Sequence, residues 1–178
     1  MKKVISIALV LVLALTLLAS CGADYKLEGT AKEILDKVLE KKPTDFASAT
    51  LTDDPSFPDL TKSENADMLG YYIGVKDNTI VEDIAVSESA FGMQPYSMIV
   101  LKVKEGTDVD ATKKAILDGI DMRKWMCVNA DKLVVTNCGN VIFILMSTDE
   151  FYNVDEGLKT FVEITENHAD EALERTFA

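Results

Sequence analysis

The chain has 178 residues, of which 48% are hydrophobic and 27% charged, and its formal net charge is −12 at pH 7. This length suits one folded domain with its own core. Such an acidic chain offers no basic patch for a phosphate backbone, so we expect no nucleic-acid partner.

The N-terminal segment has the pattern of an export signal. Two lysines precede about 16 uncharged, mostly apolar residues, a length typical of a signal-peptide core and too short for a comfortable membrane span. The sequence Leu-Ala-Ser-Cys that follows, ending at Cys21, is similar to a bacterial lipobox. In such signals the cysteine sulfur receives a diacylglyceryl group, and cleavage between Ser20 and Cys21 makes the cysteine the new N-terminus.

These features predict a lipoprotein signal peptide over residues 1–20, a short tether over 21–28 with lipidated Cys21, and a single α+β domain over 29–178. Because each buried CH₂ contributes roughly 0.8 kcal/mol, two or three acyl chains would anchor the protein firmly. We therefore expect a cell-membrane protein on the extracytoplasmic face. The alternatives are a plain secretory signal with an incidental cysteine and a retained transmembrane helix.

Removal of residues 1–20 takes away two lysines and no acid, so the formal charge would change from −12 to −14. Anionic lipid would repel a domain this acidic, which leaves the N-terminal lipid as the predicted membrane contact. A tether from Gly22 to Glu28 would reach at most roughly 25 Å when extended.

The first half of the domain is predicted to hold one helix and three strands. Thr30 and Glu33 have capping-box spacing at the start of an amphipathic helix that ends before Pro43. An irregular connection with room for a short strand follows. Two strands over 68–75 and 79–86 are expected to pair as a hairpin. A third, over 96–104, alternates apolar residues with lysines and is expected to be half buried.

The second half is predicted to hold two helices and two strands. A helix begins near Thr107, and Arg123 and Lys124 would complement the C-terminal end of its dipole. Strands over 132–138 and 141–146 would form a hairpin, the second buried on both faces. A last helix begins near Asn153 and, with a break near Asn167, continues through residue 173.

The predicted order is helix, three strands, helix, two strands, helix. Since hairpins join most neighbouring strands, we expect an α+β fold, a mostly antiparallel sheet of about five strands packed with about three helices.

Several short motifs are similar in order and spacing to one family of bacterial lipoproteins. They are the lipobox, Tyr71-Tyr72-Ile73, Glu88-Ser-Ala-Phe91-Gly-Met93, the segment from Tyr96 to Thr107, and Gly139-Asn140-Val-Ile-Phe-Ile-Leu145 with Ser147-Thr-Asp149. Over roughly residues 30–152 the chain resembles the family catalogued as domain of unknown function 4358, uncharacterised lipoproteins of Clostridia-like Gram-positive bacteria. The resemblance implies no activity, ligand or catalytic residue.

The usual catalytic sets are absent from the sequence. A Ser/His/Asp triad, a papain-like Cys/His pair and a two-histidine zinc site would all need histidine, and His168 is the only one in the chain. We expect His168 at the edge of the apolar stripe of the last helix. No G-x-S-x-G, H-E-x-x-H, C-x-x-C or glycine-rich phosphate loop occurs.

The remaining cysteines and acids predict no site either. Cys127 and Cys138 flank a strand that would hold them roughly 20 Å apart, so we expect free thiols rather than a disulfide. The acid clusters Asp53-Asp54 with Asp59, and Asp108 with Asp110, lack the spacing of a calcium loop. We therefore predict no catalytic, cofactor-binding or metal-binding residue and no cofactor.

Three classes of function remain open. The favoured one is a non-catalytic, lipid-anchored module that binds a protein or another envelope component at the cell surface; exposed aromatic side chains would support it. The second is a small-solute receptor for a transporter, which would need a large apolar pocket with converging polar groups. The third is an unrecognised envelope enzyme, which would need a cleft with perturbed carboxylates.

Overall fold

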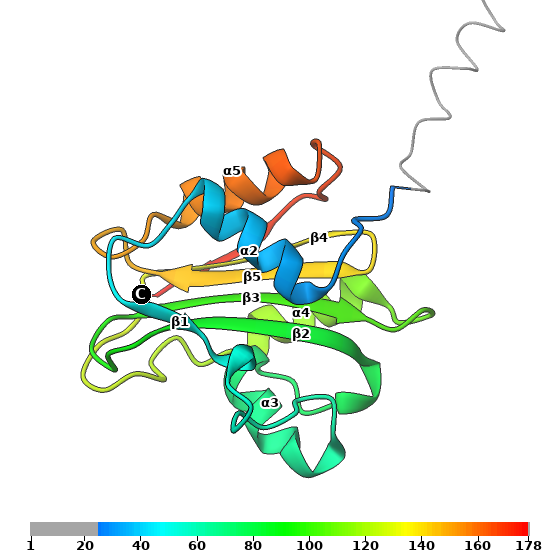
Figure 1. Cartoon of the computed structure of the whole chain (residues 1–178), viewed down its shortest axis with the longest axis horizontal. Coiled ribbons are helices and arrows are strands. Elements are labelled where there is room, and N and C mark those ends of the chain that lie inside the picture. The colour runs from blue at the N-terminus through cyan, green and yellow to red at the C-terminus, as the bar shows by residue number, and fades with distance from the viewer. Residues whose placement is uncertain (1–24, 178) are drawn as a thin grey trace, which may run out of the picture.

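A computed structural model describes residues 25–177 of the chain. The expected cleavage and lipidation residues, Ser20 and Cys21, lie outside this range. The described residues form an antiparallel sheet with helices on both faces (Figure 1). The predicted α+β class and mostly antiparallel sheet are confirmed.

Six strands pair in the order β1-β2-β3-β5-β4-β6, every pair antiparallel. They are β1 (Ser48–Thr50), β2 (Val81–Ser89), β3 (Tyr96–Val103), β4 (Lys132–Cys138), β5 (Val141–Ser147) and β6 (Leu173–Thr176). The helices are α2 (Ala31–Lys41), α3 (Ala66–Ile73), α4 (Val109–Gly119) and α5 (Val154–Ile164). Three short 3₁₀ segments cover Leu51–Asp53, Ser63–Asn65 and Asn78–Ile80.

The helices form two outer layers. Helices α2 and α5 cover one face of the sheet, and α3 and α4 cover the other (Figure 1). Alternate residues of β3 therefore meet different layers: Ile99 and Leu101 pack toward α3 and α4, Met98 and Val100 toward α2 and α5. The prediction that this strand is half buried is wrong, because a second pair of helices covers its other face. Burial of β5 on both faces is confirmed.

The first helix follows its prediction closely. The hydroxyl of Thr30 accepts a hydrogen bond from the backbone N–H of Glu33 at 3.1 Å, and the Glu33 carboxylate accepts one from the Thr30 N–H at 2.8 Å. This reciprocal capping box satisfies two N–H groups that an uncapped helix would leave free. The irregular connection after α2 contains β1, as expected.

Residues 68–75, predicted as a strand, belong instead to helix α3. The buried residues Leu69, Tyr72 and Ile73 have the i, i+3, i+4 spacing of a helix face. Gly74, at φ +72°, ends the helix in the left-handed conformation. The expected hairpin between 68–75 and 79–86 is therefore absent, and β2 pairs with β1 and β3.

The last predicted helix is too long. Helix α5 begins after the N-cap Asn153, as expected, but ends at Ile164. Glu166 (φ 53°) and Asn167 (φ 64°) reverse the chain, which returns along the sheet as edge strand β6 beside β4. The last apolar residues have the spacing of a helix, but the backbone hydrogen bonds that they gain by pairing with the edge strand β4 stabilise a strand instead.

Helix α4 also ends earlier than expected. Asp108 caps its N-terminus by accepting a hydrogen bond from Ala111 N at 2.9 Å. The helix stops at Gly119, so Arg123 and Lys124 do not complement its dipole as predicted. They lie in the loop over 120–131 that leads to β4.

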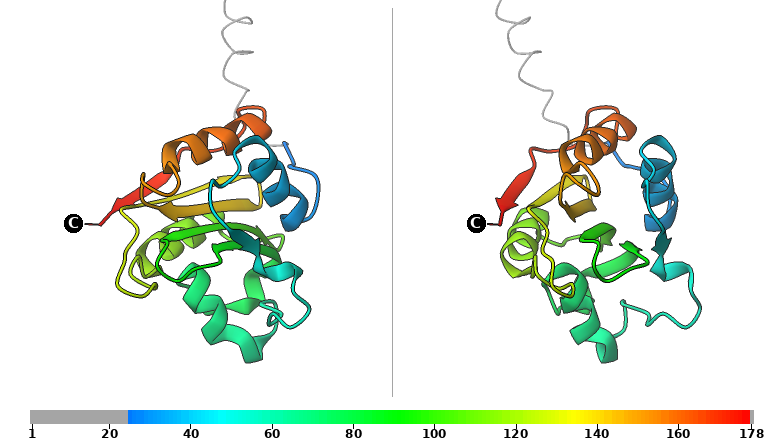
Figure 2. Two further views of the ribbon diagram at one scale, coloured as in Figure 1. Left: turned by 60° about the vertical axis from the view of Figure 1, so that its left-hand side comes forward. Right: turned by 90° about the vertical axis from the view of Figure 1, so that its left-hand side faces the viewer.

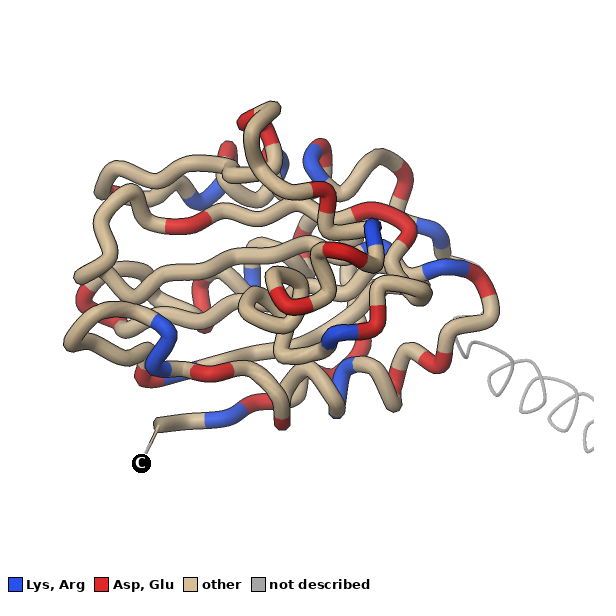
Figure 3. Tube along the Cα trace, turned by 90° about the horizontal axis from the view of Figure 1, so that it is seen from below, with Lys and Arg blue, Asp and Glu red and all other residues tan. Residues whose placement is uncertain are grey.

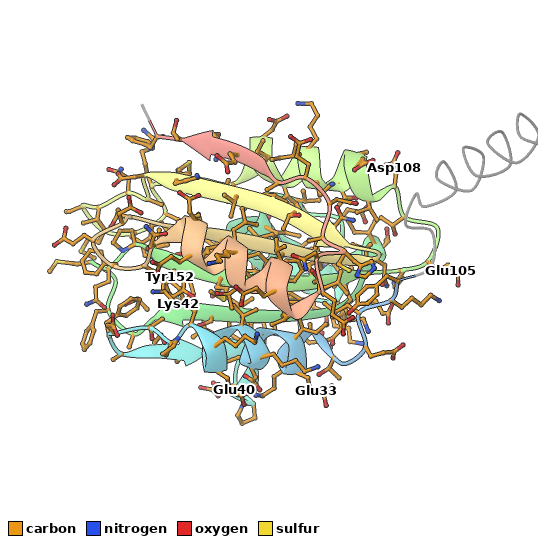
Figure 4. The ribbon with its side chains drawn as sticks, turned by 90° about the horizontal axis from the view of Figure 1, so that it is seen from above. Glu33, Glu40, Lys42, Glu105, Asp108 and Tyr152 are labelled. Carbon is orange, nitrogen blue, oxygen red and sulfur yellow. The ribbon has the colours of Figure 1, made fainter. Side chains whose placement is uncertain are left out.

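The two ends of the sheet carry different segments. We call distal the end where Tyr96 and Lys132 both pair with Ser147; it holds the β2–β3 loop, the 120–131 loop and the loop after β5. The opposite, proximal end holds the β4–β5 turn at Gly139 and the described N-terminus at Tyr25, whose carbonyl lies beside that glycine. Figure 2 shows this first described segment in blue, leading into α2. In Figure 4, the labels Glu105 and Asp108 mark the proximal end, and Lys42 and Tyr152 lie toward the distal end.

Candidate functional site

A buried ion pair joins β2 to the 120–131 loop. The ammonium of Lys124 lies 2.5 Å from Glu88 Oε1, and the two side chains are only 2% and 10% exposed. Lys124 also donates to Ser97 Oγ at 3.2 Å, and the indole N–H of Trp125 donates to Glu88 Oε2 at 3.3 Å. Both carboxylate oxygens of Glu88 are thus partnered, as a buried charge requires.

Three aromatic rings surround the same ammonium. Lys124 Nζ lies 5.0 Å from the ring centroids of Tyr71 and Tyr72 and 5.2 Å from that of Trp125. At these distances the ring faces attract a cation. Both tyrosines reach the pair because residues 66–73 form a helix rather than a strand. The site therefore depends on the element that the sequence analysis assigned wrongly.

Burial and charge act in opposite directions on the titration of Lys124. Its pKa is lowered because burial penalises the charged ammonium, while the nearby Glu88 carboxylate favours that form. The pKa of Tyr72 is raised, chiefly by burial and then by the charge of Glu88. The cluster is a low-dielectric environment in which a charge needs its partner.

Beside this cluster, two loops expose large apolar side chains. Phe91 and Met93 in the β2–β3 loop are 60% and 66% exposed, and Met126 in the 120–131 loop is 72% exposed. The backbone N–H of Met126 donates to the carbonyl of Gly92 at 3.1 Å, which joins the two loops. We call Phe91, Met93 and Met126 the distal surface. Exposed apolar groups gathered in this way mark interaction sites.

Hydrogen bonds and the buried ion pair fix the positions of both loops, the β2–β3 loop and the 120–131 loop. Ser89 Oγ accepts a hydrogen bond from Phe91 N at 3.1 Å and bonds Gln94 Oε1 at 2.7 Å, which orders the tip of the β2–β3 loop. Lys124 and Trp125 immediately precede Met126, so the buried pair with Glu88 anchors the other loop at the point where it becomes exposed. The apolar side chains are thus presented on a preorganised support.

His168 lies outside α5, contrary to the prediction that it edges the helix stripe. Its ring stacks on Tyr25, with centroids 4.1 Å apart and an interplanar angle of 2°. Its Nδ1 lies 3.1 Å from the carbonyl oxygen of Thr165. The turn that ends α5 carries the histidine to the proximal end, where it packs against the start of the described chain.

The two cysteines of the described residues have free thiols, as predicted; Cys127 is exposed and Cys138 is buried. Burial raises the pKa of the Cys138 thiol to about 11, and the charge of Asp170 adds to this rise. A thiol that stays protonated is a poor nucleophile, so Cys138 has no reactive character at neutral pH.

The acidic residues of the connection after α2 are occupied locally. Asp54 accepts hydrogen bonds from the backbone and hydroxyl of Ser56, and Asp59 does the same with Thr61. These bonds lower the pKa of both carboxyls. Asp53 lies 3.3 Å from Lys32. A pocket of about 280 Å³ beside Asp54 and Asp59 is therefore lined by carboxylates already engaged in turns.

The second acid pair is also engaged, since Asp108 caps α4 and Asp110 lies 3.0 Å from Lys113. Within residues 25–177, no three His, Cys, Asp or Glu side chains are placed to share a metal ion. Among the same residues, no helix is long and apolar enough to cross a bilayer.

Sequence reasoning missed the Glu88–Lys124 pair because its members are 36 residues apart. Glu88 was noted only within a motif of the family resemblance, and Lys124 was assigned to a helix end. The available signal was weak: Lys124 stands beside the single tryptophan of the chain, but Glu88 lies in a strand that also carries Glu82, Asp83 and two serines, so it does not stand out as a residue that needs a buried partner.

Comparison with known proteins yields no relative for this arrangement. No protein-family model matches the chain, and no curated protein and no solved structure matches it. The similarity to the lipoprotein family catalogued as domain of unknown function 4358 therefore stays a prediction drawn from its motifs.

Proposed function

We propose that this protein is a lipid-anchored, extracytoplasmic binding module that holds a partner protein at the distal surface and catalyses no reaction. The observation that carries the proposal is the exposure of Phe91, Met93 and Met126 on two adjoining loops. A surface of this kind costs solubility unless a partner covers it. The support beneath it, a buried ion pair in an aromatic cluster, suits a binding surface that keeps its shape.

The contacts at the proximal end support the anchored arrangement. Tyr25 stacks on His168, and Tyr25 and Leu27 both pack against the core beneath α2 and α5. If the lipid is on Cys21, three residues separate it from Tyr25, and the chain spans at most about 14 Å between their Cα atoms. Part of the expected tether over 21–28 is thus bound to the fold, which keeps the proximal end near the bilayer.

The distal surface would then point away from the membrane. It lies at the other end of β3, a strand of eight residues that spans roughly 25 Å. This places the partner on the outer side of the domain, within reach of the envelope and beyond the lipid headgroups. The negative net charge of the domain also keeps the distal surface away from the bilayer, because anionic headgroups repel it.

The anchor is tested by replacing Cys21 with alanine and fractionating the cells. The parent should remain in the membrane fraction and incorporate labelled palmitate, whereas Cys21→Ala should do neither. Equal membrane retention of both chains, without label in the parent, would overturn the anchor.

The binding function is tested by photo-crosslinking in intact cells. A photoreactive amino acid at Met126 should capture one protein reproducibly, identified by mass spectrometry. The same amino acid at Lys37, an exposed position on α2, is the control and should not capture that protein. Capture should also disappear in the Phe91→Ser variant. Equal capture from both positions, or none from Met126, would remove the binding proposal.

A further inference from the structure

The charges around the distal surface indicate what kind of partner it accepts. Four exposed acids lie at the same end of the sheet, two in the 120–131 loop and two in the loop after β5: Asp121, Asp131, Asp149 and Glu150. Figure 3 shows how the acidic and basic residues are distributed along the described chain. The exposed base there, Arg123, lies 3.6 Å from Asp121 and is thereby neutralised. Three exposed acids without a basic partner among the described residues, Asp131, Asp149 and Glu150, therefore lie at the same end of the sheet as the apolar side chains, and we call them the acidic border.

The methionines of the distal surface suit a binding site because their side chains are flexible. Two of the three side chains of the distal surface are methionines, whose flexible thioethers adapt to differently shaped apolar groups. A partner that buries them must bring apolar side chains of its own, and its charges must oppose the acidic border. A polypeptide segment with aliphatic and basic side chains meets both demands.

Two other occupants fit less well. The bilayer is remote from the distal surface if the proximal end is anchored, and its anionic headgroups would be repelled. A second copy anchored in the same membrane would present its distal surface in the same outward direction, so the two surfaces could not face each other. Each anchored copy, without residues 1–20 and their two lysines, would also carry a formal charge of −12 − 2 = −14, which opposes their association.

We infer that the distal surface binds a basic, amphipathic segment of a partner polypeptide located on the side of the domain away from the membrane. This inference rests on the proposed binding function and adds the chemistry of the partner. Apolar contact with Phe91, Met93 and Met126 supplies the affinity, and the acidic border selects the sign of the partner's charge and speeds its association.

The test reverses charge on the full-length protein in cells, with crosslinking from Met126 as the readout. Asp131→Lys with Glu150→Lys changes two exposed acids of the border, neither of which has a side-chain bond in the fold. The control, Glu28→Lys with Glu40→Lys, makes the same change of charge at two exposed acids away from the distal surface, one in the segment before α2 and one on α2. We expect the border variant to lose at least about five-fold in crosslinked product and the control to lose less than about two-fold.

The crosslinked peptide itself provides a second readout. Mass spectrometry should locate the attachment in a partner segment with net positive charge and aliphatic residues. Equal yields from border variant and control, or attachment to a neutral or acidic segment, would overturn the inference while the binding function stands. Failure to capture any protein from Met126 would overturn both. Immunoblots and limited proteolysis of each variant verify that it is folded and present at the parental level.

Discussion

Replacing Lys124 with methionine should be among the most damaging single changes in the described part of the chain. Methionine fills much of the same volume but removes the charge, which leaves the Glu88 carboxylate buried with only the indole N–H of Trp125 at 3.3 Å. Removal of one member of a buried ion pair costs about 3–5 kcal/mol. Loss of the cation–π contacts belongs to the same cost.

For a domain of this size, 1 kcal/mol corresponds to a change in Tm of about 2–4 °C, so Lys124→Met should lower Tm by about 6–20 °C. The purified chain beginning at Gly22 can be unfolded by heat or urea and followed by circular dichroism. The fluorescence of Trp125 reports on the cluster directly. Lys114→Met is the matched control, because that lysine is exposed and its ion pair with Asp118 contributes little.

A double variant separates the charge from the packing. Glu88→Gln combined with Lys124→Met removes both charges, and the amide can still accept from Trp125, so its free energy of unfolding should lie within about 1.5 kcal/mol of the parent. The reasoning fails if Lys124→Met costs less than about 1 kcal/mol. It fails equally if the double variant is as unstable as the sum of the single ones.

Two further predictions concern backbone contact and thiol chemistry. Gly74→Ala should destabilise by at least about 2 kcal/mol in urea unfolding. Its φ is +72° and a Cβ would lie 2.2 Å from the carbonyl carbon of Gly119, whereas Gly92→Ala, with open space around it, should change the free energy little. At pH 8 an alkylating reagent should label the exposed Cys127 and reach the buried Cys138 only after unfolding, as counted by intact mass. Burial raises the pKa of the Cys138 thiol from its ordinary value of 9.0 to about 11 in the folded state. Between these values the folded state binds more protons, so its stability should fall as pH rises through that window, and Cys138→Ala should remove this part of the slope.

The elements that the sequence predicted well are those whose signals are local. The capping box at Thr30, the glycine turn at Gly139 and the continuous apolar run of β5 each depend on residues within one or two turns of chain. Short-range hydrogen bonds and side-chain period decide such elements, and so they could be assigned without a structure. Of the two hairpins from which the antiparallel class was inferred, the one at Gly139 exists and the one over 68–86 does not, but the class holds because β2 pairs with β3 instead.

Other elements were decided by contacts between distant parts of the chain. Residues 68–75 carry tyrosines and glycines compatible with a strand, but the face made by Leu69, Tyr72 and Ile73 packs on the sheet beside α4, and that burial selects a helix. The last residues pair with the free edge of β4 rather than extend α5. Local propensity differs too little between the alternatives to settle either case.

The sequence alone therefore determined the composition, the charge, the antiparallel class and a predicted anchor at Cys21. Tertiary structure decided that Glu88, Lys124 and the rings of α3 meet, and that the exposed side chains of two separate loops adjoin. The physical reason is that a buried charge is stable only when an oppositely charged partner offsets its loss of hydration, and here that partner comes from a distant part of the chain. No local sequence pattern predicts that Glu88 and Lys124 meet, because their contact depends on how the helices and the sheet pack together.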